Sequence, residues 1–377
     1  MTESPDRHPA LEPVSLGSLD LANRLMVAPM TRISATPAGV PTELMADYYA
    51  EFASGGFGLV ITEGIYPDAA YSQGYLDQPG LVTQEHIDGW RVVTDRVHAD
   101  GARIVAQLMH AGALSQGNPY RSETLAPSAV EPLGTMMEAY GGSGPWPVPR
   151  EATSDDIADV VDGFAAAARN AAAAGFDGIE VHAANGYLLD QFVTEYTNQR
   201  TDEYGASTAN RIRLTAEVVE RIVAETPEGF IVGVRVSQTK VNDVVYRWSG
   251  GAEDVVVISE SLAKAGAHYI HVASEGRSWF ETAQLADGST VTGLAREVSG
   301  LPVIANGGMH DRDQAARVLA EGHADFLAIG HVALANPDLP NRLAAGDELA
   351  EFDPAMLRPS VTIESSLRWR QAGRAWQ

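Results

Sequence analysis

Short apolar runs alternate along the chain with longer amphipathic stretches. Apolar side chains occupy nearly every position of these runs, a pattern typical of parallel strands that are covered on both faces. Each run has the length of one strand rather than of a helix. We predict eight strands, at residues 25–29, 58–62, 103–107, 178–182, 231–236, 269–272, 303–306 and 326–329.

The stretches between the runs have the spacing of helices that bury one face. The clearest covers residues 153–174, where Thr153 or Ser154 can cap the helix N-terminus. Eight alternations of strand and helix, with no second module, favour one closed barrel. We therefore predict an α/β protein in which residues 1–377 form a single (β/α)8 TIM-barrel domain. An open doubly wound sheet is the alternative architecture.

Two segments are additions to this pattern. Residues 11–22 read as a short hairpin before the first strand, placed to close the bottom of the barrel. Residues 112–150 form a long insertion after the third strand, irregular because of the glycines and proline at 141–145. Long loops in compact domains are usually functional. This one should lie over the C-terminal face, where barrel enzymes keep their active sites.

The composition excludes several classes of protein. The chain has no cysteine, which excludes disulfides, iron–sulfur clusters and thiolate catalysis. Its formal net charge of -24 repels polyanions, so we expect no nucleic-acid partner. No apolar run approaches the roughly 20 residues that span a bilayer, and the first residues lack the pattern of a secretory signal. We expect a cytoplasmic protein with no membrane partner and no metal site.

The segment FDGIEVHAANGYLLDQF, at residues 176–192, carries the clearest candidate chemistry. His182 ends a predicted strand, and Asn185 and Tyr187 follow it on the next loop. A histidine and a carboxamide can together hold one oxygen on which negative charge develops, and a phenol can act as a general acid. Each residue alone has a structural explanation. Their combination at the C-terminal end of a barrel strand favours a catalytic site.

This segment, followed by NQRTDEYG at 198–205 and Asn210–Arg211, resembles the old yellow enzyme family of flavin-dependent ene-reductases. The resemblance runs from about Leu16 to Leu343. It implies an FMN-dependent enzyme that uses NADPH or NADH to reduce the C=C bond of α,β-unsaturated carbonyl or nitro compounds. His182 and Asn185 would hold the substrate oxygen while flavin N5 delivers hydride. Tyr187 would protonate the carbon next to the activating group.

The resemblance also implies a set of cofactor contacts. In NRLMVAPMTR, at residues 23–32, Pro29 and Met30 would lie against the isoalloxazine, and Thr31 would reach its O4–N5 edge. Further contacts to the pyrimidine side of the ring would come from Gly64, Gln107 and Arg235. An arginine in an apolar strand needs an anion, because burying an unpaired guanidinium is costly. A salt bridge from Arg235 to a barrel carboxylate is the alternative.

The last two strands predict a phosphate site. Gly307, Gly308 and Gly330 follow strands seven and eight, where the backbone amides of barrel enzymes hold phosphate. His331 stands where the family commonly has an arginine, and it is a weaker anchor for a dianion. We therefore expect weakened or pH-dependent FMN binding. The other departures from the family pattern are Met109, Ala113 and Ala206, where many members have tryptophan, arginine and glycine.

Two other function classes are open at this point. One is an FMN-free, phosphate-binding TIM-barrel isomerase or lyase that uses the same glycines. A Schiff-base aldolase is disfavoured, because neither Lys240 nor Lys264 is placed on a convincing strand end. The other is a non-catalytic flavin-binding protein. We expect a small-molecule substrate, an activated alkene, and a chain that is a monomer or a homodimer.

Overall fold

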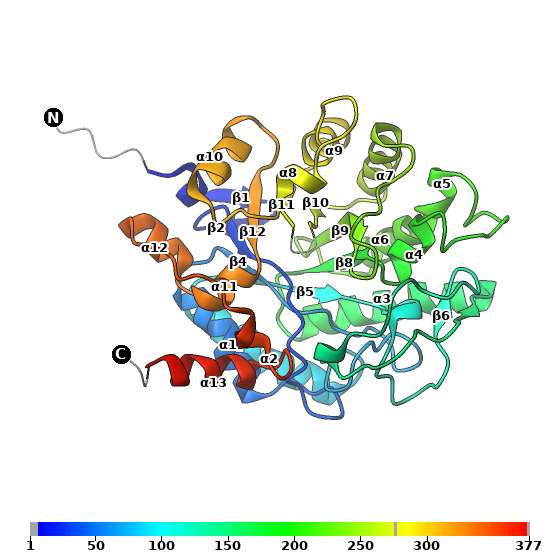
Figure 1. Ribbon diagram of the computed structural model, residues 1–377, viewed down its shortest axis with the longest axis horizontal. Helices are drawn as coiled ribbons and strands as arrows, with labels where there is room; N and C mark the ends of the chain where they lie inside the picture. Colours follow the sequence, from blue (N-terminus) through cyan, green and yellow to red (C-terminus); the bar gives the residue numbers. More distant parts are fainter. Residues whose placement is uncertain (1–6, 275–276, 375–377) are drawn as a thin grey trace.

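Eight parallel strands form a closed barrel in this computed structural model, which describes residues 7–274 and 277–374 (Figure 1). Neighbours around the ring follow the order of the chain, and β12 pairs with β3 to close it. The predicted (β/α)8 barrel is confirmed, and the open sheet is wrong. The strands are β3 (Leu25–Val27), β4 (Leu59–Ile61), β5 (Arg103–Leu108), β8 (Gly178–Asn185), β9 (Ile231–Lys240), β10 (Tyr269–Val272), β11 (Val303–Asn306) and β12 (Phe326–Ile329).

The predicted bounds of β10, β11 and β12 are correct, whereas β8 and β9 extend beyond theirs. The two strands continue to pair past the barrel rim, where Asn185 lies opposite Lys240 after a register shift that follows Ala183. Every residue of both strands is buried, although their last residues are polar. The sequence-based bounds stopped short because polar residues there end the apolar run.

Helices surround the barrel and cover its outer face (Figure 1). In α3, Thr153 is the N-cap: its side chain accepts from the backbone N–H of Asp156, whose carboxylate accepts from Thr153 in return. Among the described residues, none of the helices is both long and apolar enough to cross a membrane. The helices are α1 (Glu43–Ser54), α2 (Gln84–Ala99), α3 (Ser154–Ala173), α4 (Leu188–Val193), α5 (Thr208–Arg211), α6 (Arg213–Glu225), α7 (Ala252–Lys264), α8 (Trp279–Thr282), α9 (Val291–Ser299), α10 (Arg312–Ala320), α11 (His331–Ala335), α12 (Leu339–Ala345) and α13 (Ile363–Arg374).

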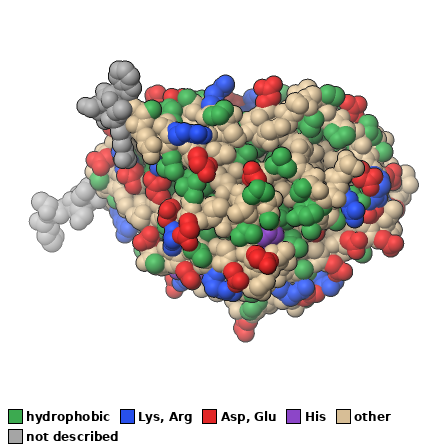
Figure 2. Space-filling view, turned by 90° about the horizontal axis from the view of Figure 1, so that it is seen from below, with side chains coloured by type: hydrophobic (Ala, Val, Ile, Leu, Met, Phe, Trp, Pro, Cys, Tyr) green, Lys and Arg blue, Asp and Glu red, His purple; other side chains and the backbone are tan. Residues whose placement is uncertain are grey.

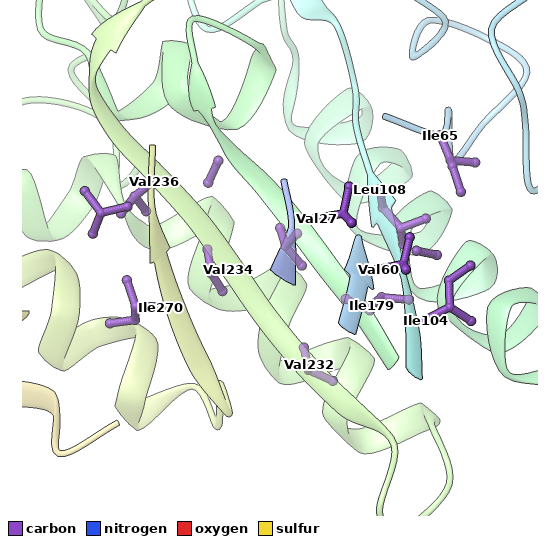
Figure 3. Close-up of a cluster of buried hydrophobic side chains, with 14 of the residues drawn as sticks. Val27, Val60, Ile65, Ile104, Leu108, Ile179, Val232, Val234, Val236 and Ile270 are labelled. Atoms are coloured by element: carbon purple, nitrogen blue, oxygen red, sulfur yellow. The ribbon is translucent and has the colours of Figure 1, made fainter. Parts of the chain in front are cut away.

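The strands divide the hydrophobic core into two parts. Side chains that alternate outward, such as Val27, Val60 and Val234, pack against the helices (Figure 3). Inward-facing side chains fill the barrel with a second apolar cluster that includes Met26 and Phe326. This interior cluster occupies the lower part of the barrel, so polar inward residues are confined to the C-terminal end.

The predicted N-terminal hairpin is present as β1 (Val14–Leu16) and β2 (Leu19–Leu21), which pair antiparallel. Leu16, Leu19 and Leu21 join the cluster inside the barrel. The hairpin therefore closes the bottom of the barrel as predicted, and burial of its leucines removes apolar surface from water.

The predicted insertion, residues 112–150, covers the C-terminal end of the barrel. It contains the short elements η2 (Gly112–Leu114), β6 (Leu125–Ala126) and η3 (Glu138–Tyr140), and β7 (Arg150–Glu151) follows it. Its Met136, Met137 and Tyr140 pack against a cluster that includes Tyr75 and Tyr187. The insertion thus forms part of the wall around the strand ends that carry the candidate residues.

Charged side chains are distributed over the surface rather than gathered in one patch on the face shown in Figure 2. Many acidic residues pair with the less numerous arginines; Arg96, for example, binds both Glu43 and Asp47. At the C-terminal end of the chain, Arg370 of α13 binds Glu51 of α1 through both carboxylate oxygens, at 2.7 and 2.8 Å. Exposed ion pairs contribute little individually to the free energy of unfolding. This pair connects α13 to α1, one of the helices that cover the barrel.

Replacing Ala206 by glycine should stabilise the protein. Ala206 has a positive φ of 65° in the turn before α5, a conformation that costs an L-residue about 1–2 kcal/mol. We expect Ala206→Gly to raise the free energy of unfolding by about 1 kcal/mol, after the greater chain entropy of glycine is subtracted. Urea denaturation measures the change. Ala216→Gly, inside α6, is the matched control and should lose about 1 kcal/mol; a similar loss at residue 206 would contradict the prediction.

Candidate active site

A cavity of about 320 Å³ opens at the C-terminal ends of the barrel strands. Its volume lies within the range of small-molecule sites. It brings together every catalytic and cofactor-binding residue that the sequence predicted, from seven of the eight strand ends. The thirteen residues are Pro29, Met30, Thr31, Gly64, Gln107, His182, Asn185, Tyr187, Arg235, Gly307, Gly308, Gly330 and His331.

The end of β8 places His182, Asn185 and Tyr187 on one wall of this cavity. Positive φ angles at Asn185 (68°) and Gly186 (88°) turn the chain so that Tyr187 becomes the N-cap of α4. The turn is held from two sides: the backbone N–H of Asn185 donates to Ser237 Oγ at 2.8 Å, and that of Gly186 donates to Asp190 Oδ2 at 2.6 Å. The three side chains therefore sit on rigid backbone rather than on a loose loop.

Among the cavity residues that the sequence predicted, three have a buried polar atom with no hydrogen-bond partner within the described part of the chain: His182 Nδ1, Asn185 Oδ1 and Arg235 Nε. Leaving a buried polar atom unpaired costs about 1–3 kcal/mol, and such atoms need an explanation in a folded protein. All three belong to residues that line one cavity. The arrangement points to a polar ligand that pairs with them.

The electrostatic setting keeps His182 uncharged. Burial lowers the pKa of His182 well below its ordinary value, and the positive charge of Arg235 and the neighbouring His271 lower it further. At neutral pH the ring is therefore a neutral imidazole, which donates one N–H and accepts at the other nitrogen. It can hold an oxygen by donating a hydrogen bond, without carrying a charge of its own.

Arg235 is not committed to a carboxylate of the barrel. The guanidinium forms no salt bridge with any acid that the structure describes, and the barrel carboxylate Glu180 is bridged to His271 instead, at 2.9 Å. Arg235 is only 5% exposed and lines the cavity. The predicted need for an anion therefore stands, and the alternative of a salt bridge to a barrel carboxylate is wrong.

The loop after β3 is clamped by Glu63, which sequence reasoning missed. Glu63 is buried at the end of β4, and its Oε2 accepts from the backbone N–H groups of Arg32 (2.8 Å) and Ile33 (3.0 Å), while Oε1 accepts from Tyr49 (3.2 Å). These bonds hold the segment that carries Thr31 against the cavity. Burial raises the pKa of Glu63 from 4.5 to about 7, although the three donors oppose the shift.

Gly64 packs against Met109 at the edge of the cavity. A Cβ at this position would lie 2.7 Å from Sδ of Met109, so a larger residue here would require the methionine side chain to move. Met109, itself 2% exposed, also lines the cavity. A methionine thus forms this part of the cavity wall, at the position where many members of the resembling family have tryptophan.

One end of the cavity, which we call the glycine end, is formed by Gly307, Gly308 and Gly330. The chain turns sharply at the first two, and there is open space beside the third. Gly307 and Gly308 have positive φ angles of 107° and 78°. The nearest atom to a Cβ on Gly330 would be 4.0 Å away, so its backbone is accessible from the cavity. His331 begins α11 and stacks on Phe352, with ring centroids 4.8 Å apart. Burial and the charge of Arg32 lower the pKa of His331, which leaves its ring uncharged at neutral pH.

Several lining residues were not predicted. Arg277 and His310 follow β10 and β11, and Tyr140 comes from the insertion. The first two lie on loops at strand ends, the same signal that identified the predicted residues, so the sequence could have yielded them. Leu357 and Val361 reach the cavity from the C-terminal segment, and nothing in the local pattern indicates this.

Lys240 corrects one sequence-based argument. It is the last residue of β9, so the expectation that neither lysine lies at a strand end is wrong. Its ammonium is buried and binds Asp190 at 2.6 Å and the carbonyl of Ser237 at 3.2 Å. The lysine is thus committed to the carboxylate that also holds Gly186, and it is not among the residues that line the main cavity.

Comparisons with known proteins agree with this architecture. A sequence profile described as the NADH:flavin oxidoreductase / NADH oxidase family matches residues 10–350. The chain is 37% identical to a probable flavin mononucleotide-dependent alkene reductase of Leishmania infantum, over 92% of this chain and 93% of that protein. Its fold matches the old yellow enzyme homologue from Zymomonas mobilis with a TM-score of 0.83 and 30% identity, over 94% of this chain and 98% of that one. It matches morphinone reductase in complex with tetrahydroNAD with a TM-score of 0.81 and 32% identity, over 92% and 93% of the two chains.

The buried Glu63 should make stability depend on pH in a defined direction. Its pKa in the folded protein is about 7, against an ordinary 4.5. Glu63 therefore makes its full contribution to the free energy of unfolding below pH 4.5. As the pH rises through 7, the free energy of unfolding falls by about 3 kcal/mol. Glu63→Gln should remove this loss, so the variant gains stability relative to the parent protein across that window.

Urea denaturation of both proteins between pH 4.5 and pH 8 measures the difference. Glu297→Gln, at an exposed position of α9, is the control and should leave the pH profile of the parent protein unchanged. Profiles of the parent protein and the Glu63 variant that run parallel would contradict the prediction.

Proposed function

Because the chain belongs to the old yellow enzyme family, that of the NADH:flavin oxidoreductases, we propose that it is an FMN-dependent ene-reductase. Its substrates would be α,β-unsaturated carbonyl or nitro compounds, with NADH or NADPH as the reductant. The observation that carries the proposal is the set of buried, unpaired polar atoms on His182, Asn185 and Arg235, three residues that line one cavity together with Tyr187. The guanidinium of Arg235 suits a ligand with an anionic edge, and a ring N–H of His182 and the amide NH2 of Asn185 can donate to a substrate oxygen.

The residues of the cavity fit FMN. Arg235 provides a cation without a carboxylate partner, which suits the charge on the pyrimidine side of a reduced flavin ring. At the other end, the backbone of Gly307, Gly308 and Gly330 would hold the phosphate. Pro29, Met30 and Thr31 would contact the ring from the end of β3, and Gly64 and Gln107 would line its polar edge.

The redox chemistry would belong to the cofactor: when bound, FMN carries two electrons from NADH or NADPH to the alkene. The protein residues would orient and polarise the substrate. His182 and Asn185 would donate hydrogen bonds to its carbonyl or nitro oxygen, where negative charge develops as the double bond is reduced. This stabilisation explains the expected preference for alkenes with an electron-withdrawing group.

Tyr187 would deliver the proton to the carbon next to that group. Its hydroxyl lies 2.5 Å from the hydroxyl of Tyr75, which is buried and stacked on Tyr140. A phenolate formed on Tyr187 could accept a hydrogen bond from Tyr75, which lowers the cost of giving up the proton. A second phenol thus holds the proton donor in place.

An FMN-free isomerase or lyase would use only the glycine end of the cavity. It would leave the unpaired atoms of His182, Asn185 and Arg235 without a role. We therefore favour the flavin enzyme, and the colour of the purified protein separates the two.

The first test is an absorbance spectrum, followed by reaction with NADPH or NADH and then 2-cyclohexenone under nitrogen. We expect a flavin band that the nicotinamide bleaches and the enone restores. A protein that stays colourless after FMN is added would exclude the proposed function.

Tyr187→Phe should slow the enone-dependent step by about 10²–10⁴-fold, the usual contribution of a general acid, and leave bleaching by the nicotinamide unchanged.

Tyr204→Phe is the matched control for that variant. The Tyr204 hydroxyl binds Glu217 at 2.9 Å, and the residue does not line the cavity. Its removal should change neither step. Equal slowing of both half-reactions by Tyr187→Phe would indicate a loss of structure and not of a proton donor.

Replacing His331 by arginine should tighten cofactor binding, because it adds a positive charge at the end of the cavity formed by Gly307, Gly308 and Gly330. His331→Arg would place a permanent charge beside Gly330, and a guanidinium can retain the stacking on Phe352. We expect the FMN dissociation constant, measured by flavin fluorescence, to fall about tenfold, since a hydrogen bond to a charged group is worth about 1.5–3 kcal/mol. The control is His331→Gln, which adds no charge and should not tighten binding; unchanged affinity in the arginine variant would contradict the argument.

A further inference from the structure

A carboxylate lies inside the barrel beneath the cavity, and the mechanism above does not use it. Glu180, on β8, is fully buried. It accepts three hydrogen bonds from inward-facing side chains of β5 and β10: from Gln107 Nε2 at 2.8 Å, from the Tyr269 hydroxyl at 3.1 Å and from His271 Nδ1 at 2.9 Å. Three donors satisfy this buried charge. Its effects on the cavity residues above it follow from these contacts.

The first consequence concerns the direction of the Gln107 amide. An ionised carboxylate has only acceptor atoms, so it can pair with the amide nitrogen and not with the amide oxygen. Gln107 lines the cavity and is 2% exposed. The contact with Glu180 therefore leaves the carbonyl oxygen of Gln107, and its second N–H, for a ligand. Turning the amide round would set its oxygen against the carboxylate.

The second consequence concerns charge. His182 on β8 lies opposite Arg235 on β9. His182 is also the next inward-facing residue of β8 after Glu180, toward the C-terminal end of the barrel. Burial alone would raise the pKa of Glu180, but His271, Arg235 and Gln107 together lower it, so the group is ionised at neutral pH. The carboxylate thus opposes part of the positive field that Arg235 applies to the cavity. It does so without forming a salt bridge that would occupy the guanidinium.

We propose that Glu180 is a positioning residue for the cofactor, which fixes the direction of the Gln107 amide and offsets the charge of Arg235. This inference rests on the proposed function, because it takes FMN as the ligand of the cavity. Gln107 would then offer its oxygen to the N3–H of the ring, the one donor between two carbonyl groups. Glu180 would set both the affinity for oxidised FMN and the reduction potential of the bound flavin.

The two effects have opposite signs when the charge is removed. In Glu180→Gln, the new amide can donate to the Gln107 oxygen, so Gln107 is free to turn, and oxidised FMN should bind about tenfold more weakly. The field of Arg235 would then act unopposed on the anionic reduced ring, so reduced FMN should lose less affinity. If the reduced form loses none, the midpoint potential rises by about 30 mV, the equivalent of tenfold for a two-electron couple. General loosening of the site would not raise the potential while it weakens binding.

Glu180→Asp separates the two roles. It keeps the charge but is shorter by one methylene, so it should lose the contact with Gln107 and weaken FMN binding without raising the potential. Tyr269→Phe is the matched control, because it removes one donor to Glu180 and changes neither the charge nor Gln107. Its FMN affinity should equal that of the parent protein.

The experiment measures the FMN dissociation constant by fluorescence and the midpoint potential by dye-coupled titration, for the parent protein and the three variants. The result expected is weaker binding in both Glu180 variants, with a raised potential only in Glu180→Gln. The inference would be overturned if both Glu180 variants had the FMN affinity and the midpoint potential of the parent protein. It would also be overturned if FMN binding weakened equally in all three variants while the potential stayed unchanged. If Glu180→Gln does not fold, the comparison of Glu180→Asp with Tyr269→Phe decides, and equal affinities overturn it. A parent protein that binds no FMN would overturn the proposed function itself, which is a distinguishable failure.

Discussion

The closure of eight parallel strands into one ring is the constraint on which the rest of the structure depends. Inside a closed barrel, inward side chains have no neighbour except one another, and the strand period of two decides which residues these are. The lower layers are apolar and are sealed by the leucines of the hairpin. The polar inward residues of β5, β8, β9 and β10 are therefore gathered at the C-terminal end, in two successive layers that line the cavity or lie directly beneath it.

At this end of the barrel, hydrogen-bonded and unpaired polar groups are sharply divided. Glu180 receives three donors from two strands, β5 and β10. His182, Asn185 and Arg235 each keep a buried atom without a partner in the described chain. Each unpaired atom lowers stability, and a core selected for stability alone would pair them. The division is typical of a binding site, where the ligand completes the hydrogen bonds that the fold leaves open.

A second buried charge pair supports the site from the side. Lys240 and Asp190 meet where β8 and β9 extend past the barrel rim, and Asp190 also holds the backbone of Gly186. Removing either partner would leave the other charged and buried, which is strongly destabilising. The pair thus fixes the turn that carries Asn185 and Tyr187, although neither charged group lines the cavity. At the glycine end, by contrast, His331 contributes an uncharged ring stacked on Phe352.

The sequence by itself determined the barrel, the hairpin, the insertion and the candidate residues at the strand ends. Apolar runs and helical spacing are local patterns, and a parallel strand covered on both faces leaves such a run. Only the tertiary structure decided how those residues are held. Gln107 meets Glu180, Glu63 clamps the loop at Arg32, and Lys240 reaches Asp190. These partners lie far apart along the chain, on different strands and loops, so no local pattern encodes their contact. Barrel closure and the shared burial of polar groups bring them together.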